Sequence, residues 1–125
     1  MTDKAWTWDQ SAGVLTDPDG KRAGGGYSGR GEGLNNPEAQ DDRSKGPIPQ
    51  GLWQIGRPRN SVRTGPFVLD LTPIAGTKTF GRSAFQIHGD NRLGNFTASS
   101  GCIILRRDIR ERIAASPVKT LRVVA

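Results

Sequence analysis

Short apolar segments bounded by Gly, Pro, Asn and Asp recur along most of the chain. Apolar or alternating runs of this length are typical of β-strands, and the residues that bound them favour turns. The Asp-Pro-Asp-Gly sequence at 17–20, for example, presets the backbone angles of a tight turn. The pattern predicts strands over 5–8, 13–15, 51–56, 66–71, 84–88, 102–105 and 120–124.

Two stretches depart from this strand pattern. In the segment 106–116, Ile109 and Ile113 lie one helical turn apart and Pro117 follows, which predicts a short amphipathic helix. Residues 23–49 are rich in Gly, Asn, Asp and Pro without a hydrophobic period, which predicts a long loop. Because Tyr27 within it is of a buried type and such loops are often functional, we expect an ordered loop that lines a site.

Composition supports a mainly β fold. The chain of 125 residues fits one domain over 1–125, and its 17 glycines and 8 prolines suit many turns. An apolar fraction of only 34% disfavours helical layers. We expect a small β-sandwich or barrel with one short helix after Cys102, and Trp53 in its core.

The formal net charge of +6 indicates attraction to an anionic partner: nucleic acid, an acidic membrane face or a carboxylate-rich polymer. No aromatic-basic stacking motif or helix-turn-helix pattern is present, which argues against nucleic acid. No apolar run approaches the ~18 residues of a membrane span. Met1 to Gln10 lacks the charged and apolar regions of a cleaved leader, so we expect no signal peptide and no membrane insertion.

Candidate chemistry rests on the sole histidine and the sole cysteine. One cysteine excludes an internal disulfide, and one His with one Cys is too few for a zinc site, so no metal or cofactor is expected. Cys102 follows His88 by fourteen positions, and each lies at the edge of a predicted strand. On adjacent strands the two side chains could come within about 3 Å, where an imidazole can activate a thiol and later protonate a leaving amine.

The run Ser99, Ser100, Gly101 before the cysteine leaves backbone amides unobstructed. We expect the Gly101 and Cys102 amides to stabilise an oxyanion, where one donor contributes about 3 kcal/mol. A lone cysteine is more often a buried inert residue, and His88 alone could be an ordinary strand residue. Cys102 directly follows Ser100-Gly101 and His88 directly precedes Gly89, and this joint placement favours a catalytic role for the pair.

The string His88-Gly89, followed at a distance by Ser-Ser-Gly-Cys-Ile at 99–103, resembles the L,D-transpeptidase signature. Ser100 stands where most members have a second histidine, and Ile104 where Asn or Arg is usual. The segments 27–40, 46–56 and 97–105 are similar to the type VI secretion L,D-transpeptidase effectors. This resemblance covers residue 27 to about residue 110.

The resemblance implies the transpeptidase type of β fold and an enzyme of peptidoglycan. It implies that Cys102 is acylated by a tetrapeptide stem and that His88 is the base, with the Gly89 carbonyl, or alternatively Asp90, orienting the imidazole. Release of D-Ala to water would be L,D-carboxypeptidase activity, and its replacement by another D-amino acid would be transpeptidase exchange. It further implies an antibacterial toxin, made in the cytoplasm and injected into the periplasm of rival bacteria, with an immunity protein and a secretion-system component as partners.

Three further residues are candidates for lining the cleft. Tyr27 and Asn36 offer a phenol and an amide that suit a polar peptide, and Arg92 could bind a stem carboxylate bidentately. The alternatives are loop packing for the first two and a solvated charge for Arg92. Two other functions remain open: a different thiol peptidase or amidase of the cell wall, and a basic wall-binding or nucleic-acid-binding module without enzymatic activity.

Overall fold

The computed structural model describes residues 4–92, 94 and 96–125. Its described part is mainly β with one α-helix, as predicted. The strands are β1 (Trp6–Asp9), β2 (Val14–Thr16), β3 (Arg22–Gly25), β4 (Tyr27–Ser28), β5 (Gly51–Ser61), β6 (Gly65–Pro73), β7 (Gln86–His88), β8 (Ile103–Ile104) and β9 (Thr120–Val124). The helix is α1 (Arg107–Ala115), and two short 3-10 helices are η1 (Gly31–Gly33) and η2 (Pro37–Ala39).

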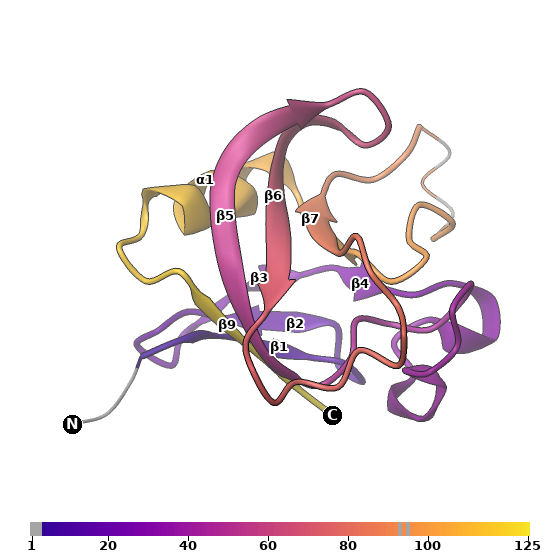
Figure 1. Cartoon of the computed structure of the whole chain (residues 1–125). Coiled ribbons are helices and arrows are strands. Elements are labelled where there is room, and N and C mark those ends of the chain that lie inside the picture. Colours follow the sequence, from indigo (N-terminus) through magenta and orange to yellow (C-terminus); the bar gives the residue numbers. More distant parts are fainter. Residues whose placement is uncertain (1–3, 93, 95) are drawn as a thin grey trace.

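All described strands belong to one sheet in the order β3-β2-β1-β9-β5-β6-β7-β8-β4. The pairs β1 with β9 and β7 with β8 are parallel, and the remaining pairs are antiparallel. β5 and β6 rise as an arch above β1, β2 and β9 (Figure 1). The sheet therefore curves around its own core.

The bend lies in β5, the longest strand. Its first residues, 51–54, pair with β9 on one side, and residues 53 and 54 also pair with β6 on the other. Its later residues pair with β6 alone. Register shifts between Ile55 and Pro58 and between Arg59 and Ser61 are of the kind that bends a strand and increases its twist. Pro58 is tolerated because the edge that faced β9 is unpaired here.

One hydrophobic cluster joins both limbs of the curved sheet to the helix. Trp8 of β1 and Trp53 of β5 are fully buried, the latter as predicted. Ile109 and Ile113 of α1 complete the cluster, which confirms the amphipathic helix expected from their spacing. Burial of these side chains is the main source of stabilisation.

The predicted loop over 23–49 was partly wrong. Its start forms β3 and β4, and only the later part is a loop, containing η1 and η2. A strand built on glycine carries no hydrophobic alternation, which is why the pattern missed it. The backbone approach is close: a Cβ on Gly26 would lie 2.0 Å from the carbonyl oxygen of Ile104. The other predicted strands are present with shifted ends, and β9 has the predicted bounds.

Among the described residues, no helix has the length and apolar character needed to cross a membrane. The first three residues of the segment examined for a leader lie outside the described residues.

Replacing Ile113 by Ala should destabilise the fold by about 2 to 5 kcal/mol, because it opens a cavity in the core beneath the sheet. Val62→Ala is the matched control, since Val62 is 107% exposed and should change stability by less than about 0.5 kcal/mol. Urea unfolding followed by circular dichroism measures both. Equal midpoints for the two variants would show that α1 is not part of the cooperative core.

Candidate active site

The predicted nucleophile, Cys102, and the predicted base, His88, line the same cleft of about 570 Å³. His88 ends β7 and Cys102 immediately precedes β8, and the parallel register pairs Ile87 with Ile103. One step back along this register, Cys102 lies beside Gln86. Since paired residues share a face and Gln86 and His88 are two apart, His88 and Cys102 point to the same side of the sheet. Both line the cleft.

The imidazole of His88 is 4% exposed, and its Nδ1 lies 2.8 Å from the carbonyl oxygen of Gly89. Burial lowers the pKa of His88, with Arg110 adding to the shift and the Gly89 carbonyl and Asp90 opposing it. A neutral ring that donates from Nδ1 to this carbonyl presents an unprotonated Nε2, as a general base requires.

Asp90, the alternative orienting group, is engaged elsewhere. Its Oδ1 accepts hydrogen bonds from the hydroxyl of Tyr27 at 2.7 Å and from the amide of Asn91 at 2.9 Å. The contact with the ring is therefore made by Gly89, the residue that the family resemblance pointed to.

The thiol of Cys102 is free and partly exposed, and it donates a long hydrogen bond of 3.8 Å to the carbonyl oxygen of Ala84. Burial raises the pKa of Cys102, while a backbone hydrogen bond from Gln86 and the charges of Arg63 and Arg82 act in the other direction. The resting group is therefore a protonated thiol. Within the described part of the chain it makes no hydrogen bond to His88, so the roughly 3 Å contact expected from sequence is not formed in this state, as is common in free enzymes.

Ser99 fixes the turn that precedes the cysteine. Its buried hydroxyl accepts hydrogen bonds from the amides of Gly29 at 2.9 Å and Gly101 at 3.0 Å and donates to the carbonyl of Cys102 at 2.5 Å. Because the Gly101 amide is already used, its prediction as an oxyanion donor is wrong for this conformation. The Cys102 amide has no hydrogen-bond acceptor in the described chain, and it is the donor that this turn leaves available.

Glycine is required at position 101 for two reasons. Its φ of +139° lies in a region that other residues rarely adopt. A Cβ there would also lie 2.5 Å from Nη2 of Arg82 and 2.9 Å from Cε1 of Phe85. The absence of a side chain at this position makes room for the guanidinium packed behind the turn.

Arg82 is the site residue that sequence reasoning missed. It is 7% exposed, and its guanidinium lies 5.1 Å from the centre of the Phe85 ring. Its two terminal nitrogens donate to four backbone carbonyls at 2.5 to 3.0 Å: Gln40, Gly46, Pro47 and Ser100. These carbonyls come from segments far apart in the chain, so no local pattern could distinguish Arg82 from the other basic residues.

Ser100 lines the cleft, but three other predicted lining residues do not. Tyr27 is buried, and besides contacting Asp90 its hydroxyl accepts a hydrogen bond from the amide of Ala98. Asn36 caps η2, accepting from the Glu38 amide and donating to the Glu32 carbonyl. Arg92 is exposed and lies outside the lining.

Tyr27 and Asn36 therefore contribute to loop packing, which was the alternative that the sequence left open for them. Ser99 is fully buried and acts behind the cleft, through the turn it holds. In the described residues, no group of His, Cys, Asp and Glu is arranged to hold a metal ion.

Replacing Arg82 by Met should destabilise the protein by at least about 2 kcal/mol, because buried carbonyls lose their donor. It should also raise the pKa of the Cys102 thiol further, because a nearby cation is lost. Arg82→Lys keeps the charge with fewer donors, so it should lose stability with a smaller change in the thiol pKa. Urea midpoints and the pH dependence of iodoacetamide alkylation report the two effects.

Arg57→Met is the control, since Arg57 is exposed on β5 and lies outside the cleft lining. If Arg82→Met matched this control in both measurements, Arg82 would not be holding the site together.

Comparisons with known proteins identify the family and the fold. A family model described as the Tlde1 domain matches residues 22–125. Among solved structures, the chain is similar to the L,D-transpeptidase Ldtfm in its avibactam carbamoyl enzyme form, with a TM-score of 0.59 and 13% identity over 100% of this chain and 50% of that chain. The chain thus spans half the length of that protein, and the likeness shows the fold. No curated protein matches.

The Tlde1 model extends from β3 to the end of β9, well over half of the chain, and the fold of the solved relative agrees with it. The family suggested by the segments 27–40, 46–56 and 97–105 is thereby confirmed: this chain belongs to the Tlde1 domain family of type VI secretion L,D-transpeptidase effectors.

Proposed function

We propose that the protein is a cysteine enzyme that acts on tetrapeptide stems of peptidoglycan, as an L,D-carboxypeptidase, as an L,D-transpeptidase that exchanges the terminal D-amino acid, or as both. Membership of a peptidoglycan-modifying effector family supports the substrate class. The observation that carries the proposal is the placement of His88 and Cys102 on one face of paired strands, opening into one cleft.

The reaction begins with transfer of the Sγ proton from Cys102 to Nε2 of His88. The thiolate attacks the carbonyl carbon of the third stem residue, and the Cys102 amide donates to the resulting oxyanion. Collapse breaks the bond to D-Ala, and the imidazolium of His88 protonates the departing amine. A thioester to Sγ remains.

The second half of the reaction decides the product. Water attacking the thioester, with His88 as base, releases a tripeptide and regenerates the thiol. A D-amino acid that attacks through its amine instead gives a modified tetrapeptide. Both outcomes share one acyl-enzyme, so the enzyme's preference depends on which acceptor reaches the thioester.

The biological role that we propose is that of an antibacterial toxin acting in the periplasm of target bacteria. The family of type VI secretion effectors supports this role. An immunity protein that occludes the cleft, and a component of the secretion apparatus, are the proposed partners. An immunity protein that binds without shielding Cys102 from alkylation would argue against occlusion.

Incubation with disaccharide-tetrapeptide muropeptides, with and without D-Met, should yield loss of D-Ala or its replacement in products read by mass spectrometry. Cys102→Ala should abolish both products, and His88→Gln should reduce their rate by about 10² to 10⁴-fold. Arg57→Met is the control for handling and folding. Unchanged muropeptides with every protein would exclude this substrate, and cleavage at another bond would favour a different peptidase or amidase.

The acid limb of the kcat/KM profile should lie below the ordinary histidine pKa of about 6.5. The reason is that burial lowers the pKa of His88, so the ring stays neutral to lower pH and activity is lost only when it is protonated. Initial rates of D-Ala release measured across the acid range test this. An acid limb above the ordinary value would mean that another group, or a different form of His88, controls the rate.

A further inference from the structure

The side chains that line the cleft give it a strongly positive character. Four arginines line it, and none of the described Asp or Glu residues does: the arginines are Arg43, Arg59, Arg63 and Arg82. A cleft lined by charges of one sign concentrates ligands of the opposite sign. The four arginines are not equivalent, however, because two of them are already bound within the protein.

Arg59 and Arg82 are already engaged within the protein. Arg59 forms a bidentate ion pair with Asp70, from Nε to Oδ2 at 2.6 Å and from Nη2 to Oδ1 at 3.0 Å. Arg82 is buried and donates to backbone carbonyls. Asp70 neutralises Arg59, and the backbone carbonyls occupy both terminal nitrogens of Arg82, so neither guanidinium is placed to bind a ligand.

Arg63 and Arg43 differ from that pair. Both are exposed, and neither guanidinium forms a hydrogen bond or ion pair with any residue of the described chain. Arg63 comes from the turn between β5 and β6, and Arg43 from the loop between η2 and β5. They are therefore the arginines of the cleft whose guanidinium groups have no partner among the described residues.

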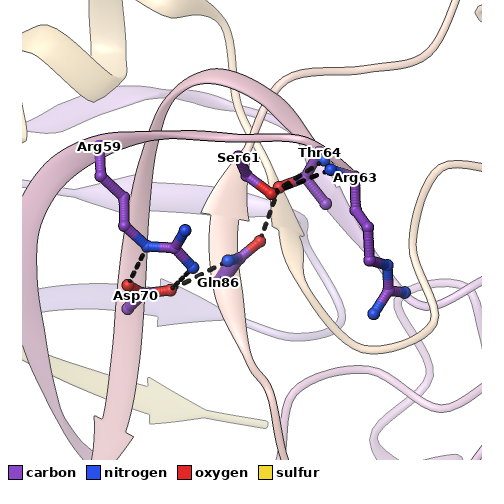
Figure 2. A network of polar contacts seen from close by, with 6 residues as sticks. All are labelled: Arg59, Ser61, Arg63, Thr64, Asp70 and Gln86. Atoms are coloured by element: carbon purple, nitrogen blue, oxygen red, sulfur yellow. Dashed lines mark hydrogen bonds and ion pairs between the residues drawn. The ribbon is translucent and has the colours of Figure 1, made fainter.

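A polar network fixes the turn that carries Arg63 (Figure 2). The hydroxyl of Ser61 accepts hydrogen bonds from the amides of Arg63 and Thr64, each at 3.2 Å. Thr64 in turn donates from its hydroxyl to Gln86 Oε1 at 2.8 Å, and Gln86 donates from Nε2 to Asp70 Oδ1 at 2.9 Å.

The network places Arg63 relative to the reacting groups. Gln86 lies beside Cys102 in the register of β7 and β8 and shares a face with His88. The turn is thus anchored to the strand that carries the base. In Figure 2 the side chain of Arg63 extends away from the network rather than into it. The charge of Arg63 also reaches the nucleophile, since it acts to lower the pKa of Cys102.

We propose that Arg63, assisted by Arg43, forms a carboxylate-binding subsite that holds the stem peptide beside Cys102. A guanidinium with free donors binds a carboxylate through two parallel hydrogen bonds. A tetrapeptide stem offers three carboxylates when its third residue is a diacid: that of the second-position D-Glu, that of the diacid side chain and that of the terminal D-Ala. Arg63 thereby takes the role that sequence reasoning gave to Arg92. This inference rests on the proposed function and deepens it.

Binding is measured by calorimetry with the synthetic tetrapeptide in a Cys102→Ala background, so turnover does not enter the measurement. Arg63→Met should raise Kd about tenfold, Arg63→Lys less, and Arg43→Met less than Arg63→Met. Arg57→Met removes the same charge from a site outside the cleft and should change Kd by less than twofold. An equal Kd for the Arg63→Met and Arg57→Met proteins would overturn the subsite.

Three further peptides, each with one carboxylate converted to a carboxamide, identify the group that is bound. One of these amides should bind to the protein with Arg63 intact with the same raised Kd that the parent peptide has for Arg63→Met. The Arg63→Met protein should bind that amide and the parent peptide with equal Kd. If Arg63→Met weakened all four peptides equally, no single carboxylate would be recognised and the subsite would be wrong.

The outcomes separate this inference from the proposed function. Absence of D-Ala release by the protein with Cys102 intact, together with Arg63-dependent binding of the peptide, would reject the reaction and keep the subsite. D-Ala release that requires Cys102 but shows the same KM in Arg63→Met would keep the reaction and reject the subsite. Absence of any binding to the Cys102→Ala protein would reject the subsite as well.

Discussion

The geometry of the cleft depends on one buried cation, the guanidinium of Arg82. Removing a charge from water is costly, and here four backbone carbonyls rather than a carboxylate compensate for it. These carbonyls belong to the loop after η2 and to the turn before Cys102, so the ion connects two segments that the sheet alone would leave independent. The same packing requires glycine at 101. A loop without regular structure is thereby held in one position against the turn that precedes Cys102.

Burial and the charges of nearby arginines act in the same direction on the pKa of His88 but in opposite directions on the pKa of Cys102. Burial favours the neutral forms of both His88 and Cys102, whereas Arg63 and Arg82 favour the thiolate. The resting pair is therefore neutral, and the thiol donates to a carbonyl instead of to the imidazole. A thiolate that forms only when the base meets the thiol is less exposed to unwanted oxidation or alkylation than a permanently ionised one.

Periodic segments were predictable from the sequence, and contacts between distant segments were not. The spacing of Ile109 and Ile113 identified the helix, and alternation identified β9, because each signal is local. β3 and β4 escaped because glycine-rich strands have no alternation. In the site, the sole Cys and sole His were sufficient to find the cleft. The functions of Arg82 and Ser99 were not accessible, since each depends on partners brought together only by the fold.

The parallel pairing of β7 and β8 links the proposed catalytic pair to the polar network of the cleft. This register sets His88 and Cys102 on one face. It also places beside Cys102 the residue Gln86, which belongs to the network that anchors the β5–β6 turn. Asp70 accepts from both Gln86 and Arg59, so one carboxylate supports the turn and neutralises the arginine nearest to it. Its lowered pKa, caused mainly by Arg59, keeps it ionised in this double role. Because Asp70 pairs with Arg59, it does not neutralise Arg63, which lines the same cleft as Cys102.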